Sequence, residues 1–115
     1  MRAIAFSSPT ALDVLTRTEQ LRYDLGRAHA APAVVARKLD VPRAAGDGAG
    51  FAIARRGTMT ARAASDDLAK AAPVAPAPEA ANAMTALAAA PDGRFAAAGY
   101  ASRTLRVVEA SGTAR

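Results

Sequence analysis

Short apolar runs separated by polar turns occupy the last third of the chain, and they predict antiparallel strands. The runs cover residues 84–88, 95–99 and 105–109. Between the first two stands Pro91-Asp92-Gly93, which favours a turn because proline fixes φ and glycine accepts a positive φ. We therefore expect a three-stranded meander over 84–115. The alternative is an alanine-rich helix over 83–98, which Pro91 and Gly93 would interrupt.

The segment 1–28 repeats this scheme less regularly. Residues 2–7, 12–16 and 20–25 are the expected strands, and Leu21 and Tyr23 share one face of the third. A helix is the alternative, because Ser8 could cap it, Pro9 could take its first position and Gly26 could end it. We favour strands, and we interpret 1–28 as a degenerate repeat unit or a helical segment.

A further degenerate unit is expected at 51–74, with strands at 51–54, 59–64 and 68–74, the last of them nearly all alanine. Two segments are expected to be linkers. Residues 29–50 form the first, because Pro42–Gly50 is rich in glycine. Residues 75–83 form the second, since closely spaced prolines in an alanine background disfavour both helices and strand ladders.

The repeat spacing points to a known architecture. Aligned third strands place Tyr23, Ala72 and Val108 at equivalent positions, separated by 49 and then 36 positions. These intervals straddle the roughly 40–45-residue period of a WD40 propeller blade. Residues 85–99 resemble the inner strands of such a blade, and 105–109 lie where the family has its Trp-Asp strand. Val108 and Glu109 replace that Trp and Asp, and the family's Gly-His dipeptide is missing.

Over 34–115 the chain shows in order Ala36-Arg37-Lys38-Leu39, a glycine-rich stretch, the degenerate unit 51–74, a linker and the unit 84–115. Within the WD40-repeat β-propeller family, this order is similar to the nucleolar transducin-beta-like group of the small-subunit processome. The resemblance implies an all-β fold: an incomplete propeller of two or three degenerate blades, 1–28, 51–74 and 84–115, joined by Ala/Pro-rich linkers. It implies a non-catalytic scaffold for protein–protein assembly in small-subunit ribosomal RNA processing. The implied location is the nucleolus, with the cytoplasm as the alternative. The implied partners are proteins of a larger complex, ribosomal RNA precursor or a small nucleolar ribonucleoprotein.

Closed propellers use four to eight blades, and each blade buries its faces only against its neighbours. We therefore expect the chain to be a fragment, or to be incomplete without other subunits.

Composition limits the core that the chain can build. Alanine accounts for 34 of the 115 residues, whereas Leu, Ile, Val and Phe together number 20. That is below the roughly 20% under which chains struggle to form a core. The net charge is +5, and 13 of the 15 basic residues are scattered arginines. The second hypothesis is therefore a partly disordered, Arg-bearing chain that binds nucleic acid through its phosphates.

Cysteine is absent, which excludes disulfides, thiol catalysis and thiolate zinc sites and fits an intracellular protein. No apolar run approaches the length that a membrane-spanning helix needs, so no membrane partner is expected. His29 is the only histidine, and a metal site needs several converging ligands. We therefore expect neither a metal site nor a cofactor.

Other polar groups also fail to predict catalysis, so we expect that the protein is not an enzyme. Asp66-Asp67 fits an acidic turn better than a general acid–base pair. Ser7-Ser8 lacks the glycines of a nucleophile elbow. The glycines at 46, 48 and 50 are not followed by the Gly-Lys-Ser/Thr of a phosphate loop.

The arginines near the turns of the last unit are expected to be solvated rim charges that could contact rRNA phosphates; they are Arg94, Arg103 and Arg106. The aromatic residues fall at strand positions and are expected in the core rather than as base-stacking platforms; they are Phe6, Tyr23, Phe51, Phe95 and Tyr100. Beyond this, no binding residue is assigned.

Overall fold

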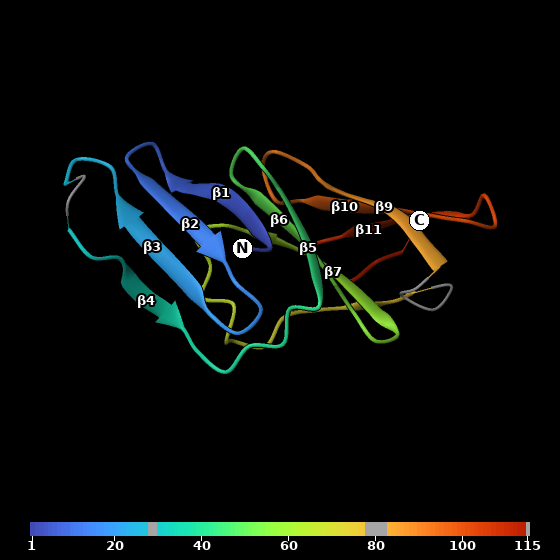
Figure 1. Ribbon diagram of the computed structural model, residues 1–115. Helices are drawn as coiled ribbons and strands as arrows, with labels where there is room; N and C mark the ends of the chain where they lie inside the picture. Colours follow the sequence, from blue (N-terminus) through green and yellow to red (C-terminus); the bar gives the residue numbers. More distant parts are fainter. Residues whose placement is uncertain (28–29, 78–82, 115) are drawn as a thin grey trace.

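Three antiparallel sheets, and no α-helix, make up the part of the chain that the computed structural model describes, residues 1–27, 30–77 and 83–114 (Figure 1). Sheet I contains β1 (Ala3–Ser8), β2 (Ala11–Leu15), β3 (Gln20–Asp24) and β4 (Ala33–Ala36). Sheet II contains β5 (Arg43–Asp47), β6 (Gly50–Arg55), β7 (Thr58–Ala63) and β8 (Ala75–Pro76). Sheet III contains β9 (Met84–Ala89), β10 (Phe95–Tyr100) and β11 (Leu105–Glu109). Strands follow chain order in each sheet, and none of these sheets closes into a barrel.

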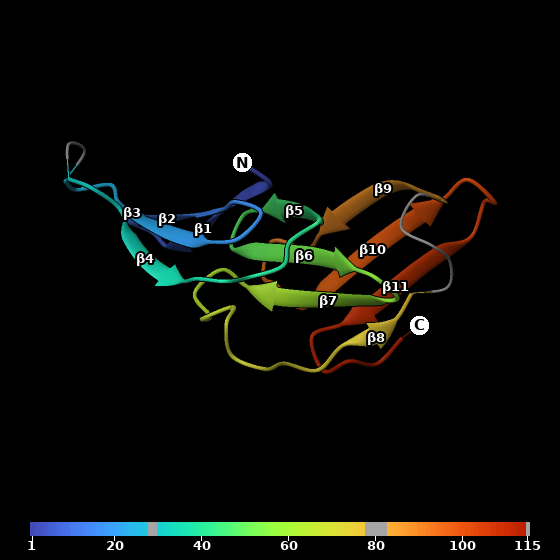
Figure 2. The same ribbon diagram turned by 60° about the horizontal axis from the view of Figure 1, so that its bottom comes forward.

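The sheets lie one after another, with their first strands adjacent. β1 contacts β5, and β5 contacts β9, so these three strands follow one another across the molecule (Figure 2). They begin at Ala3, Arg43 and Met84, so the start of each sheet follows the start of the one before it at a nearly constant interval. The repeating structural unit is therefore an antiparallel meander of about forty residues.

Sheet II is the middle layer, and the neighbouring sheets bury both of its faces. In β6, Phe51 and Ile53 face sheet I, whereas Ala52 and Ala54 face sheet III. All four are buried, as expected for a strand whose neighbours cover both of its faces. The molecule measures 45 × 24 × 23 Å along its principal axes, which reflects three sheets in a row.

Two apolar layers hold the sheets together. Between sheets I and II the largest buried side chains include Leu15, Val41, Phe51, Ile53 and Leu68. Between sheets II and III they are Met59, Met84, Tyr100 and Val108, surrounded by alanines. The Tyr100 hydroxyl donates a 3.6 Å hydrogen bond to the Met59 sulfur across that layer. Because large residues are few, alanines fill much of these layers, and their small side chains let neighbouring sheets approach closely.

The meander predicted over 84–115 is confirmed. β10 pairs with β9 on one side and with β11 on the other, and Gly93 has the positive φ, 77°, that the turn requires. Strands at the start of the chain are also confirmed, because β1, β2 and β3 form one ladder. The helix alternatives for both segments are wrong.

The linker predicted at 29–50 is wrong, because it holds β4 and β5. Its glycines mark close packing as well as turns. A Cβ on Gly46 would collide with the carbonyl oxygen of Ile4, and one on Gly50 with that of Ala90. Both glycines therefore let the first hairpin of sheet II pass directly against the backbones of its two neighbours.

The strand predicted at 68–74 is also wrong. That segment is a loop, and the ladder resumes only in β8, where Met59 pairs with Ala75 inside the expected linker 75–83. Part of that linker, 78–82, lies outside the described residues. The alignment of Ala72 with Tyr23 and Val108 fails as well, since β7 is the third strand of sheet II.

Candidate functional site

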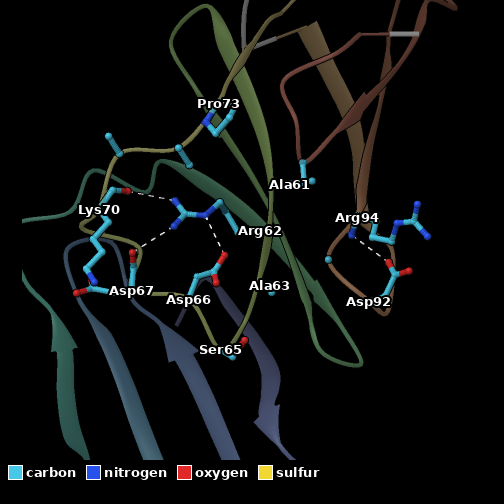
Figure 3. A pocket seen from close by; sticks show the side chains of 14 residues that line it. Ala61, Arg62, Ala63, Ser65, Asp66, Asp67, Lys70, Pro73, Asp92 and Arg94 are labelled. Carbon is cyan, nitrogen blue, oxygen red and sulfur yellow. Dashed lines mark hydrogen bonds and ion pairs between the residues drawn. The ribbon is translucent and has the colours of Figure 1, made fainter.

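A pocket of about 750 Å³ opens between sheets II and III (Figure 3). Its walls come from the end of β7, the loop that follows it, and the turn between β9 and β10. Six charged side chains line it: Arg62, Asp66, Asp67, Lys70, Asp92 and Arg94. A concave surface lined by charges of both signs is a candidate binding site.

Arg62 organises the loop wall of the pocket. Its guanidinium donates to the backbone carbonyls of Asp67 at 3.2 Å and of Lys70 at 3.4 Å (Figure 3). Its Nε lies 3.5 Å from an Asp66 carboxylate oxygen, and its side chain is 11% exposed. Because its donors are engaged and it is nearly buried, Arg62 shapes the pocket rather than offering a free charge to a ligand.

The opposite wall is the turn between β9 and β10. Asp92 accepts a 2.9 Å hydrogen bond from the Arg94 backbone N–H, and a Cβ on Gly93 would collide with the backbone of Ala63. The turn therefore sits directly on the end of β7. The Arg94 side chain is exposed at the rim, with its guanidinium 5.9 Å from the centre of the Phe95 ring.

Side chains of both charge signs line this pocket. Exposed Lys70 and Arg94 lie on different walls, and the exposed residues Asp66 and Asp92 line the same pocket. Both signs of charge within one groove suit a polar, extended segment that carries both. Within the described ranges no group of three or more His, Asp or Glu side chains could hold a metal ion.

A buried polar network lies behind the pocket and joins sheet I to its loop. Asp13 is fully buried and accepts hydrogen bonds from Arg22 Nε at 2.7 Å, Arg22 NH2 at 2.9 Å and Gln20 Nε2 at 2.8 Å. Gln20 also donates to the Asp66 carbonyl at 2.8 Å and accepts from the Leu68 backbone N–H at 2.9 Å. The hydrogen bonds that Arg22 donates to Asp13 are the main cause of the raised pKa of Arg22.

The structure separates the arginines that the sequence grouped. Arg94 borders the pocket, Arg103 stands in the turn after β10 with a φ of 70°, and Arg106 is half-buried in β11. Of the remaining polar candidates, Asp66 and Asp67 line the pocket. His29 lies outside the described residues.

Other candidate residues have structural surroundings. Among the described residues, the Ser7 hydroxyl is buried without a hydrogen-bond partner, and Ser8 Oγ accepts from the Thr10 backbone N–H at 3.2 Å. Phe51 and Tyr100 are in the core as expected, but Phe6 and Tyr23 are 46% and 37% exposed. The expectation of a core position is therefore wrong for these last two.

Sequence reasoning missed Arg62, Lys70 and the Asp13–Gln20–Arg22 network. A signal for the network was available, because strand alternation places Asp13 on the same face as buried Leu15. A carboxylate on the apolar face of a strand needs buried partners. Arg62 offered no comparable signal, because it donates to the backbone carbonyls of Asp67 and Lys70, whose positions the loop conformation sets. The position of Lys70 in the pocket wall depends on the same loop.

Comparisons of the chain with models of known families, with curated proteins and with solved structures give no match. In the ranges that the structure describes, no helix has the length and apolar character to cross a membrane. The case for a function therefore rests on the geometry of the sheets and the pocket.

Proposed function

We propose that the protein is a non-catalytic scaffold of the WD40 propeller type that binds other proteins. One observation carries the proposal: three antiparallel meanders follow one another, starting at Ala3, Arg43 and Met84, with their first strands adjacent. A repeat of about forty residues with this strand order is typical of propeller blades. The resemblance of 85–109 to a WD40 blade supports the same architecture.

The charged pocket is the proposed docking site for a partner segment. Loops and turns at one end of stacked sheets are held by a rigid scaffold, which suits recognition. In this pocket Arg62 and the Asp13 network fix the loop, while Lys70 and Arg94 remain exposed on opposite walls. The proposed ligand is an extended segment of a partner protein that carries both acidic and basic side chains.

A selection of random peptides displayed on phage tests this function. Selected peptides are expected to contain both charge signs, and their binding should be measured by fluorescence polarisation. K70E and R94E should each weaken binding at least about tenfold, because each replaces a favourable contact with a repulsive one. Arg17→Glu is the matched control, since Arg17 stands in the turn between β2 and β3, is 60% exposed and pairs only at 3.8 Å with Asp40.

Two results would contradict the proposal. The selection could yield no binding peptide, or R94E and R17E could weaken binding equally. The competing hypothesis is nucleic-acid binding, which the net charge of +5 and the predominance of arginine among the basic residues favour. A labelled single-stranded RNA would then bind the unmodified protein with an affinity that falls steeply as salt rises.

Assembly within ribosomal RNA processing is also part of the proposal, and the resemblance to the nucleolar group alone supports it. Binding of pre-rRNA by the scaffold would also depend on salt, but it would leave peptide binding at the pocket intact. The two assays together therefore distinguish a protein scaffold from a nucleic-acid-binding chain.

A further inference from the structure

The outer face of sheet I is an exposed apolar surface that spans four strands. Cross-strand pairing aligns two rows on this face, Ile4–Val14–Leu21–Val34 and Phe6–Leu12–Tyr23. Ile4, Phe6, Tyr23 and Val34 are each between 37% and 46% exposed. Neither row contains a charged side chain. A contiguous apolar surface of this kind marks an interaction site.

The outer face of sheet III has the opposite character, because small residues dominate it. Cross-strand pairing aligns the rows Ala88–Ala97–Val107 and Ala86–Gly99–Leu105. Ala86 and Ala88 are exposed, and Ala97 and Gly99 are partly exposed. One end of the molecule therefore presents large apolar side chains. The other end presents mainly small ones, with Leu105 exposed at one edge of that face.

The two interfaces inside the chain show how such faces fit together. Phe51 and Ile53 of sheet II pack against the face of sheet I that carries Ala3 and Ala5. Likewise, the larger side chains of sheet III pack against alanines of sheet II. The large residues are Met84, Tyr100 and Val108, and the alanines are Ala52, Ala54 and Ala61. In both interfaces the later sheet contributes most of the bulky residues. The earlier sheet contributes mainly alanines and one large side chain, Leu15 in the first interface and Met59 in the second.

We propose that the exposed face of sheet I packs onto the outer face of sheet III of a second copy of this chain. This contact would repeat the large-on-small packing of the two internal interfaces, since sheet I carries the unused bulky face and sheet III the unused small face. A contact of this head-to-tail kind closes into a ring when the rotation between copies allows it.

Two copies would give a ring of six sheets, which is within the four to eight that closed propellers use. Two identical contacts would join the copies, and both apolar faces would be buried. The ring size rests on the proposed propeller arrangement, whereas the pairing of faces rests on the two internal interfaces. Peptide binding at the pocket is a separate readout, so either proposal could fail alone.

Sedimentation velocity from about 1 μM to about 100 μM tests the proposal on the unmodified protein. We expect a species of twice the 11.7 kDa chain mass. F6K on the bulky face and A97R on the small face should each weaken dimerisation at least tenfold. Val74→Lys and Ala101→Arg are the matched controls, because Val74 and Ala101 are exposed outside both faces, and they should leave the dimer intact.

Mixing the two variants separates this arrangement from others. An equimolar mixture of F6K and A97R should form dimers, because one of the two contacts then joins two unaltered faces. Circular dichroism must show that each variant is folded. If one is not, Tyr23→Ser or Ala88→Lys replaces it, because both residues are exposed on the same faces.

Several results would overturn the proposal. The unmodified protein could be monomeric over the whole range, which would overturn the contact itself. Open polymers larger than a dimer would overturn the closed ring of two copies. A97R could remain dimeric while F6K does not, which would mean that two bulky faces pack on each other. Finally, both face variants could remain dimeric, which would place the contact elsewhere.

Discussion

Replacing Asp13 with alanine removes the acceptor at the centre of the network that joins sheet I to the loop of sheet II. Three hydrogen bonds of 2.7–2.9 Å end on its carboxylate, two of them from Arg22. A hydrogen bond to a charged group contributes about 1.5–3 kcal/mol, but these bonds are not independent. Arg22 is 33% exposed and can regain water, and Gln20 keeps the Asp66 carbonyl. We expect a loss of about 3 kcal/mol.

Urea unfolding followed by circular dichroism measures this loss, and a thermal melt should show a fall of about 10 °C. Asp24→Ala is the matched control, because Asp24 is exposed and accepts a 2.9 Å hydrogen bond from the Gly26 backbone N–H. It should cost under about 1 kcal/mol. In the double variant D13A/R22A, the loss should be smaller than the sum of the two single losses. The expectation is refuted if the free energy of unfolding of D13A lies within about 0.5 kcal/mol of that of the unmodified protein. It is also refuted if the values for D13A and D24A differ by less than about 0.5 kcal/mol.

The remaining predictions concern packing and pH. Phe51→Ala should lower the free energy of unfolding in urea by about 3–5 kcal/mol, because Phe51 is fully buried between sheets I and II. Gly46→Ala should destabilise the protein by more than about 2 kcal/mol, because the new Cβ would collide with the Ile4 backbone. Gly26→Ala is the control and should cost less than about 1 kcal/mol, because its Cβ would meet only a side-chain oxygen at 3.3 Å. The hydrogen bond to Asp13 raises the pKa of Arg22, so Arg22 stays charged until well into alkaline pH. A raised pKa gives stability that is lost only above it, so the difference between D13A and the unmodified protein should be equal at about pH 7 and about pH 10.

Local patterns predicted strands well where turn chemistry and alternation agreed. Pro91-Asp92-Gly93 identified the hairpin of sheet III, because a proline and a positive-φ glycine leave few other conformations. Where glycine served a tertiary contact, the local interpretation failed. Gly46 and Gly50 are characteristic of a loop in sequence, yet they lie in strands that pass against neighbouring backbones.

The pocket was less accessible to sequence reasoning. Arg94 and Asp66 could be singled out from the turns in which they stand, but nothing local places them across one groove. Whether these residues meet depends on how sheets II and III stack. The repeat alignment could not predict that stacking, because it placed Ala72 in the third strand of the middle unit, where the structure has β7. Asp13 shows the converse, since its place on a buried strand face is visible in the alternation of β2.

Nuclear Overhauser effects between backbone protons report directly on the stacking of the three successive sheets. We expect contacts of Gly46 with Ile4 and of Gly50 with Gly93, because a Cβ on either glycine would meet those backbones at less than van der Waals distance. These pairs are far apart in sequence and join different sheets. A spectrum with the strand contacts of each hairpin but without both of these pairs would contradict the account, as would helical contacts over 84–110.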